Sequence, residues 1–278
     1  MSLIRVDLEK CDRDGFCVEV CPLGILMLDE KEGPQVVKGR AQYCIACGHC
    51  VAACPHGALD NARNPLSAQG VLPRYPVVDA PTALAFLRSR RSIRRYREDP
   101  VPRERIAQVL EAARYAPSGH NSQGISYMVV DDRSTLKHIN GLVVEWMRGL
   151  VVSQPELASR LHMPGIIKSH EHGEDRILRD APALIVAFAP RELHPAPVTT
   201  TLALEYLELY ATTLELGTCW AGYTQVCAQQ FPPLIEFLEI PEDSVVTGMM
   251  MLGYPKLEYY RLPERNLLSI KWFEAKAS

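Results

Sequence analysis

Seven of the nine cysteines lie within the first 54 residues of this 278-residue chain. They form two groups, and only Cys219 and Cys227 follow in the rest of the sequence. Closely grouped cysteines without a secretory leader are typical of metal ligation rather than of a disulfide framework. The opening MSLIRVDLEK carries several charges and no apolar segment, so we expect no signal peptide and a reducing, cytoplasmic environment. The cysteines therefore predict a metal-binding N-terminal domain.

The second cysteine group has the spacing C-x2-C-x2-C-x3-C-P, which is that of bacterial ferredoxins. Its members are Cys44, Cys47, Cys50 and Cys54. Soft thiolates suit iron–sulfur clusters, and in this spacing three of them hold one cluster while the fourth reaches another. A structural zinc site is the alternative, but zinc sites rarely carry three cysteines at two-residue gaps. The pattern favours two iron–sulfur clusters.

The first group departs from that spacing at one position. Cys11, Cys17 and Cys21 fit it, but Asp14 stands where the second cysteine is expected. This departure resembles ferredoxins whose first cluster is a 3Fe-4S centre, or a 4Fe-4S centre with an oxygen ligand on one iron. A carboxylate binds iron more weakly than a thiolate does, so that corner is expected to be labile. Two alternatives stay open, with Asp14 as a ligand or as a bystander.

The resemblance to two-cluster ferredoxins also implies a crossed set of ligands. Cluster one is then held by Cys11, Asp14, Cys17 and Cys54. Cluster two is held by Cys21, Cys44, Cys47 and Cys50. His49 and His56 are expected to face solvent.

The remaining sequence predicts a second domain of mixed helices and strands. Residues 61–80 hold three prolines and no helical period, so we divide the chain into a ferredoxin-like domain (1–62), a linker (63–80) and an α+β domain (81–278). Glycine and proline at 33 and 34 predict the turn of a hairpin in the first domain. In the second domain, periodicity predicts helices over 101–115, 134–152 and 199–216, and strands over 125–131, 183–189 and 245–252.

Charge is distributed unevenly along the chain. The formal net charge is -3, and residues 1–60 hold six Lys or Arg against nine Asp or Glu. The remaining 24 basic and 24 acidic residues balance, yet six arginines crowd into positions 88–97. Alone, such a stretch would be read as a solvated basic face or a nucleic-acid patch. We expect no nucleic-acid partner, and the longest apolar run, 181–190, is too short to span a bilayer.

Four motifs in the second domain resemble the nitroreductase family of FMN enzymes. The first is RRSIRRY, similar to the R-R-S-x-R element that grips the FMN phosphate and pyrimidine edge. The resemblance implies binding roles for Arg90, Arg91, Ser92 and Arg94. Guanidinium groups bind phosphate through charge-assisted hydrogen bonds, and a cation at Arg94 near N1 and O2 would stabilise reduced flavin.

The other three motifs are spread over the rest of the domain. PSGHNSQ is similar to a flavin-lining loop and implies roles for Pro117, Ser118, Asn121 and Gln123. LGTCWAG resembles the segment whose backbone amides reach N5 and O4, which implies Ala221 and Gly222. The final strand and G-Y-P turn resemble the part that completes the phosphate site with Arg261 or Arg265, of which Arg265 is slightly favoured.

The remaining histidines and cysteines of the second domain are expected to have structural roles. His120 is interpreted as a rim residue, and the two late cysteines as packing residues. Residues 170–175 carry two histidines and three acidic residues, and we interpret this patch as part of a mobile substrate lid rather than as a metal site.

The combined resemblance implies an FMN oxidoreductase fed one electron at a time by its own ferredoxin domain. The substrate class is nitroaromatic or quinone-like, and the donor is NAD(P)H or a reduced electron-carrier protein. No side chain is assigned as a catalytic acid or base, since the flavin carries the chemistry. The family also implies a homodimer, with the apolar helix around 199–216 at its interface. The alternative is an electron-transfer adaptor or redox sensor for a protein partner, which would dock on the acidic N-terminal domain.

Overall fold

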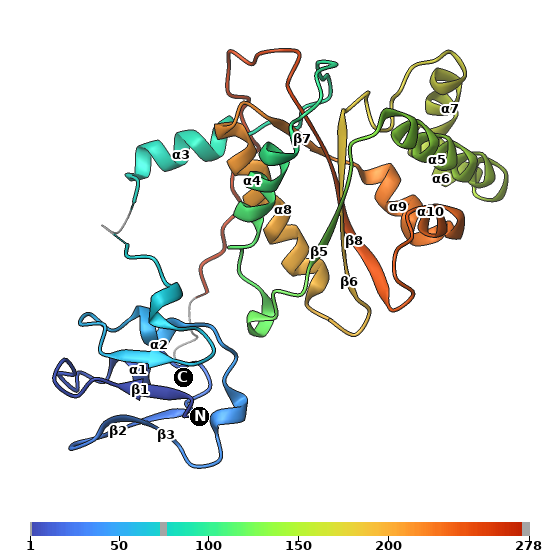
Figure 1. Cartoon of the computed structure of the whole chain (residues 1–278). Helices are drawn as coiled ribbons and strands as arrows, with labels where there is room; N and C mark the ends of the chain where they lie inside the picture. The colour runs from blue at the N-terminus through green and yellow to red at the C-terminus, as the bar shows by residue number, and fades with distance from the viewer. Residues whose placement is uncertain (1, 73–76, 274–278) are drawn as a thin grey trace.

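The computed structural model describes residues 2–72 and 77–273, which form a small N-terminal domain and a larger α+β domain (Figure 1). The N-terminal domain contains β1 (Ile4–Val6), α1 (Phe16–Glu19), β2 (Leu26–Asp29), β3 (Gly33–Val36), α2 (His49–Ala52) and β4 (Leu59–Asn61). Strand β1 pairs antiparallel with β4, and β2 pairs antiparallel with β3. The first and last strands of the domain therefore close it into one unit.

The hairpin predicted in this domain is confirmed, but its turn was placed wrongly. Gly33 and Pro34 belong to strand β3, and the turn falls on residues 30–32. The Asp29 carboxylate accepts hydrogen bonds from the amides of Lys31 (2.8 Å) and Glu32 (2.9 Å). An aspartate that caps its own turn in this way replaces the glycine-proline turn that the sequence suggested.

The two cysteine groups share one backbone conformation. Gly15 (φ 81°) and Gly48 (φ 75°) each precede a one-turn helix, α1 or α2, which carries a cysteine at its second position. Two residues before each glycine, Arg13 (φ 59°) and Ala46 (φ 55°) also adopt a left-handed conformation. Glycine is favoured at φ near +80° because a side chain is strained there. The repeated backbone puts Asp14 at the structural position of Cys47.

The beginning of the predicted linker packs on the N-terminal domain. The Asn64 amide donates to the Ala46 carbonyl (3.1 Å), and Gln69 donates to Asn64 Oδ1 (3.0 Å). The linker ends at α3 (Ala80–Ser89), a helix that the sequence did not predict. Asp79 caps this helix by accepting from the Thr82 amide at 2.9 Å. Part of the predicted linker, residues 73–76, lies outside the described residues, and the proposed domain boundaries stay a prediction.

The second domain is built around a four-stranded antiparallel sheet in the order β5-β6-β8-β7. Its strands are β5 (Ser126–Val130), β6 (Ala183–Pro190), β7 (Gly217–Trp220) and β8 (Ser244–Gly253). Its helices are α4 (Arg103–Ala113), α5 (Arg133–Ser153), α6 (Pro155–Arg160), α7 (Met163–Glu171), α8 (Ala196–Thr213), α9 (Gly222–Gln230) and α10 (Pro232–Phe237). The predicted helices and strands are confirmed within a few residues.

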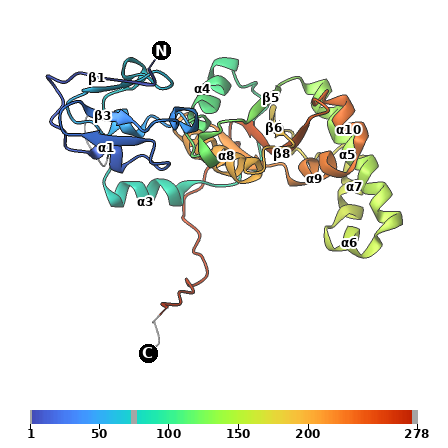
Figure 2. The same ribbon diagram turned by 90° about the horizontal axis from the view of Figure 1, so that it is seen from below.

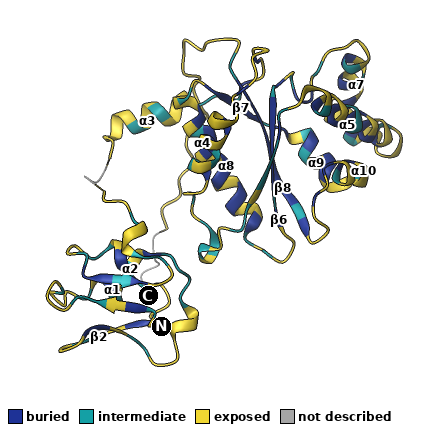
Figure 3. Cartoon of the chain, viewed as in Figure 1, coloured by how far each residue is buried: buried dark blue, intermediate teal, exposed yellow. Residues whose placement is uncertain are grey.

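Helices cover both faces of the sheet. Helices α4 and α8 pack on one face, and α5 to α7, α9 and α10 lie on the other (Figure 1). The two central strands β6 and β8 are buried along nearly their whole length, as their continuous apolar runs require (Figure 3). Each face therefore has its own hydrophobic core.

The arginine-rich segment after α3 is held along the outer edge of β7. Ser92 forms a parallel bridge with Thr218, and the Ile93 amide donates to the Thr218 carbonyl at 2.7 Å. Tyr96 pairs antiparallel with Pro255. A Cβ at Gly217 would lie 2.3 Å from the Ile93 side chain, so the close approach needs glycine.

The chain after the last strand is extended and exposed. Residues 257–273 are exposed and contain no helix or strand, and Figure 2 shows this segment leaving the body of the domain. Among the described residues, no helix is both long and apolar enough to cross a membrane.

Candidate functional site

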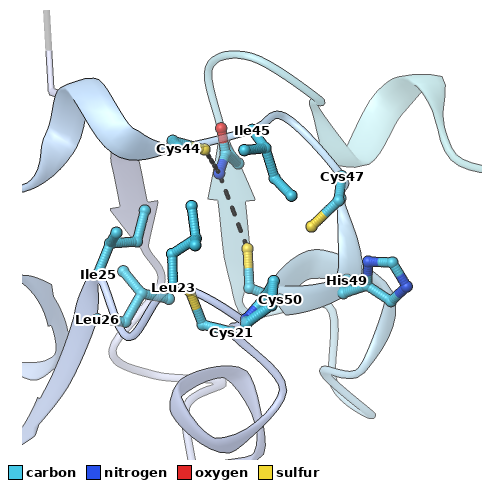
Figure 4. Close-up of a pocket in the computed structure, with 12 residues that line it drawn as sticks. Cys21, Leu23, Ile25, Leu26, Cys44, Ile45, Cys47, His49 and Cys50 are labelled. Atoms are coloured by element: carbon cyan, nitrogen blue, oxygen red, sulfur yellow. Dashed lines mark hydrogen bonds between the residues drawn. The ribbon is translucent and has the colours of Figure 1, made fainter. Parts of the chain in front are cut away.

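The predicted ligands of cluster two surround one cavity. Cys44, Cys47 and Cys50 come from the second cysteine group, and Cys21 comes from the end of the first. Figure 4 shows the four side chains around a common space, with His49 pointing away from it. The crossed arrangement that the spacing implied is thus present in the fold.

This cavity is largely apolar, with one amide directed at its sulfur atoms. Leu23, Ile25 and Leu26 line one side of it. The Asn61 amide donates to Cys44 Sγ (3.9 Å) and Cys50 Sγ (3.8 Å), as the dashed lines in Figure 4 show. Burial raises the pKa of the Cys50 thiol, and the hydrogen bond from Asn61 opposes that rise.

The predicted ligands of cluster one line a second cavity. They are Cys11, Asp14, Cys17 and Cys54. The Asp14 carboxylate accepts from the Phe16 amide at 3.0 Å, so only part of its acceptor capacity is used. Burial, followed by the negative charge of Asp14, raises the pKa of Cys17 to about 11. His56, predicted to face solvent, is exposed and pairs with Asp12 at 2.8 Å.

Both sets of side chains fit an iron–sulfur cluster. Among the described residues no three His, Cys, Asp or Glu side chains converge as they would on one metal ion. A cluster instead offers a separate iron to each thiolate, and so suits ligands spread around a cavity. Ligation by these residues stays a prediction.

In the second domain, Arg90 belongs to a buried ionic network. Its Nη1 lies 3.1 Å from Glu208 Oε1, and Glu208 on α8 is only 2% exposed. The Thr218 hydroxyl donates to the same carboxylate oxygen at 3.0 Å. The pair fixes the arginine segment against α8 and β7 and leaves the other guanidinium nitrogens of Arg90 for a further acceptor.

Three of the four family motifs meet around one cavity of about 660 Å³. Arg91 comes from the first motif, Gly217 and Thr218 from the third, and residues 255–260 from the fourth. The Arg91 Nε atom is buried and has no hydrogen-bond partner among the described residues. Within the described chain Arg94 makes no hydrogen bond, although its charge lowers the raised pKa of the buried Cys219. Arg261 and Arg265 are exposed beyond this cavity, and Glu264 between them approaches Arg88 at 3.8 Å.

The amides of the third motif differ in availability. The Ala221 amide donates to the Met249 carbonyl at 2.9 Å, so it is already part of the sheet. Gly222 begins α9, where the first amides have no partner within the helix. Of the two residues predicted here, Gly222 is therefore the better placed to donate to a flavin.

The second motif lies elsewhere, in the loop before β5. The Gln123 amide nitrogen donates to Asn121 Oδ1 (3.0 Å), and the Gln123 backbone donates to the Ser118 hydroxyl (3.1 Å). His120, Asn121 and Gln123 have φ values of 53°, 54° and 48°. Strained conformations in a loop braced by its own side chains are found at binding sites more often than elsewhere.

This loop and the arginine segment sit at opposite ends of α8. A Cβ at Gly119 would lie 2.7 Å from Pro195, which precedes the first residue of α8. Arg90 bonds to Glu208 near the other end of that helix. The rise along the helix separates these two contacts by about 20 Å. The loop also leads into one edge strand of the sheet, β5, whereas Ser92 bridges the other edge strand, β7.

The two late cysteines lie in the core, and residues 170–175 run from the end of α7 into a loop beside a separate cavity. Cys219 and Cys227 are buried in the core, which confirms their packing role, and burial raises the pKa of Cys227 to about 12. The Asp175 carboxylate caps its own loop by accepting from the amides of Ile177 and Leu178 at 2.8 Å. Residues 170–175 lie beside a cavity of about 580 Å³ next to α5, and the lid interpretation stays a prediction.

Sequence reasoning missed two polar residues and one contact between the domains. Asn61 reaches the sulfurs of Cys44 and Cys50, Glu208 pairs with Arg90, and the Ile45 carbonyl in the other domain accepts from the predicted Asn121 at 3.0 Å, a contact that the sequence did not suggest. Only Glu208 carried a signal, as an acid within an apolar helix that must be paired when buried.

Comparison with known proteins agrees with this division into two parts. A family model described as the nitroreductase family matches residues 87–254, and one described as a 4Fe-4S dicluster domain matches residues 10–58. The chain is 34% identical over 209 residues to a protein named NADH dehydrogenase from Thermus thermophilus, covering 69% of this chain and 97% of that protein. Its N-terminal part is 46% identical over 54 residues to the thiosulfate reductase electron transfer subunit PhsB of Salmonella typhi, covering 19% and 26% of the two chains.

The fold is shared with solved structures. The crystal structure of a nitroreductase with bound FMN from Bacteroides fragilis aligns with a TM-score of 0.56 and 22% identity, covering 70% of this chain and all of that one. Fold and sequence together define an α+β oxidoreductase joined to a ferredoxin-like dicluster domain. The chain belongs to the nitroreductase family. Membership confirms the predicted fold class and the class of FMN-dependent oxidoreductase, and the dicluster domain confirms iron–sulfur clusters as cofactors.

Proposed function

We propose that this enzyme takes up single electrons through its iron–sulfur clusters and uses them to reduce a small nitroaromatic or quinone-like compound at FMN. FMN, when bound, supplies the change from one-electron to two-electron chemistry. The protein supplies the position of the groups and the charges around them. The donor is NAD(P)H or a reduced electron-carrier protein, and the cysteine ligands suit the reducing cytoplasm.

One hydrogen bond between the domains carries this proposal. Asn121 of the predicted flavin loop donates to the Ile45 carbonyl at 3.0 Å. Ile45 stands between the predicted cluster-two ligands Cys44 and Cys47. The loop assigned to the flavin and the loop assigned to a cluster are therefore in direct contact, as an internal electron path requires.

The charges around the arginine segment fit a phosphate. Arg90, Arg91 and Arg94 lie within five residues of one another, and in the part of the chain that the structure describes Arg90 is the one of the three that forms an ion pair with Glu208. The Nε atom of Arg91, to which the described part of the chain offers no hydrogen-bond acceptor, adds a buried donor. Guanidinium groups bind a phosphate dianion strongly when they converge. These residues, with Ser92, would hold the phosphate end of FMN.

The rest of the flavin site would come from a second copy of the chain. The loop and the arginine segment are anchored about 20 Å apart along α8 and at opposite edges of the sheet, so the loop of a chain is remote from the arginines of the same chain. Helix α8 also exposes a stripe of apolar side chains at four-residue spacing, made of Val198, Leu202, Tyr206 and Tyr210. Such a stripe is expected to be covered. A two-fold dimer through α8 would bring the loop of one chain to the arginines of the other.

An anaerobic titration tests the proposed function. A reduced ferredoxin, NADH and NADPH are supplied separately, while flavin absorbance and cluster EPR are followed together and a nitroaromatic is then added. We expect clusters and flavin to be reduced by one of these donors and to be reoxidised by the nitroaromatic. Flavin reduction with persistently oxidised clusters would contradict the internal path. Fully reduced protein that neither nitroaromatics nor quinones reoxidise would favour the adaptor or sensor function.

A further inference from the structure

The inter-domain contact distinguishes between the two clusters. It is made by Ile45, which lies in the loop that carries the ligands of cluster two. The carbonyl of Ala46, the next residue, accepts a hydrogen bond from Asn64 of the predicted linker, which further fixes this loop. The cluster-one cavity is lined instead by residues of the first cysteine group together with Cys54, Pro34 and His56. Cluster two is therefore the one that faces the flavin domain.

The same contact also indicates which of the two flavins of a dimer lies nearer to cluster two. The N-terminal domain of a chain touches that chain's own loop through Asn121, and the loop lies at the Pro195 end of α8. The arginines of the same chain lie at the Glu208 end, about 20 Å away along the helix. A flavin held by these arginines is thus remote from the clusters of its own chain.

We infer that cluster two of each chain reduces the flavin held by the arginines of the partner chain. This inference rests on the proposed function, and specifically on a flavin site completed by the partner's loop. In each transfer a reduced cluster loses one electron and returns to its oxidised state. Two such transfers, with protons taken from solvent, complete the two-electron reduction of the flavin, and a one-electron donor of the ferredoxin class recharges the clusters.

Mixed dimers with two different affinity tags test this inference. One alteration, Cys44→Ser with Cys50→Ser, removes cluster two, and the other, Ser92→Ala with Arg94→Ala, removes flavin binding. In the split dimer each chain carries one of the two alterations. In the joined dimer one chain carries both and the other is wild type. Both dimers contain the same altered residues and are purified with one FMN each, so they differ only in which chain holds which alteration.

Flavin reduction by reduced ferredoxin is then followed by stopped-flow absorbance. A homodimer in which both chains carry Cys44→Ser with Cys50→Ser gives the rate at which reduced ferredoxin reduces the flavin directly, without cluster two. We expect the split dimer to show the fast wild-type phase at half the wild-type amplitude, and the joined dimer to show only the slow direct rate. A fast phase in the joined dimer, or its absence from the split dimer, would overturn the inference. A wild-type homodimer without a fast phase would instead mean that the proposed function is wrong.

Discussion

The two domains depend on their cofactors in different ways. Among the described residues, the main hydrophobic cluster of the N-terminal domain has five buried members, Ile4, Cys17, Ile25, Leu26 and Leu59. Four further cysteines pack against it, and all of them are predicted cluster ligands. The second domain has two extensive cores, one on each face of its sheet. Domains of about 60 residues bury too little surface to be robust without metals or cross-links. The clusters therefore contribute to the folding of the N-terminal domain, whereas FMN binds to a second domain that is held together by its own cores.

Iron removal should show this difference most strongly. We expect a strong iron chelator, added under reducing conditions, to unfold the N-terminal domain and leave the second domain folded, because cluster binding contributes directly to folding only in the first. Limited trypsin digestion should then remove the N-terminal domain and spare a fragment that contains residues 81–253. Refolding on addition of iron and sulfide is the control. An N-terminal domain that resists trypsin after complete iron loss would contradict the comparison.

Arg90→Ala should show that the stability of the second domain depends on a buried ion pair between its own side chains. The substitution leaves Glu208 buried without its partner, which is expected to cost about 3–5 kcal/mol of unfolding free energy. It should also remove most FMN while the clusters stay intact. Chemical denaturation of the FMN-free protein measures the first effect, and flavin fluorescence measures the second.

A matched set of variants separates stability from binding. Adding Glu208→Gln to Arg90→Ala should restore most of the stability but not the FMN. Arg94→Ala should reduce FMN binding with little loss of stability, because Arg94 makes no hydrogen bond among the described residues. Full FMN retention in Arg90→Ala would count against the phosphate role.

The parts of this molecule that could be predicted from sequence are those fixed by local chemistry. The cysteine groups predicted which side chains would line each of the two cavities of the N-terminal domain, although ligation itself stays a prediction. The apolar runs of β6 and β8 predicted central strands because both of their faces are buried. Helix α3 was missed because it begins within a proline-rich stretch and buries none of its residues. The hairpin turn was misplaced because Asp29 provides the turn chemistry in place of glycine.

The parts that could not be predicted depend on pairing between distant segments. Arg90 and Glu208 are 118 residues apart, and no local pattern joins them. Asn61 reaches the cluster-two sulfurs only because β4 pairs with β1 in the register Ile4 to Asn61. The separation of the two flavin motifs follows from the length of α8 and the strand order, neither of which is encoded in the motifs themselves.

Within the N-terminal domain, Asp14→Cys tests whether the two clusters differ because of the ligand at position 14. The backbone around Asp14 matches that around Cys47, so a thiolate at 14 should complete a fourth ligand without rearrangement. We expect cluster one to become a fully thiolate-ligated 4Fe-4S centre, with a changed EPR spectrum and slower iron loss to chelator. Asp14→Asn is the control, since it keeps an acceptor for the Phe16 amide but loses the charge. Identical spectra in all three proteins would show Asp14 to be a bystander.

The smallest effect is expected from Asn61→Leu, which removes the amide directed at Cys44 and Cys50. Hydrogen bonds to ligand sulfur stabilise the extra electron of a reduced cluster, so their loss should lower the reduction potential of cluster two, on the order of 50 mV for about 1 kcal/mol. Cluster one is the internal control, because its Cys54 sulfur accepts instead from the Ala58 amide at 3.2 Å. EPR-monitored redox titration would resolve the two clusters. A shift in both, or in cluster one alone, would mean that Asn61 acts through the fold of the small domain and not through the two sulfurs it contacts.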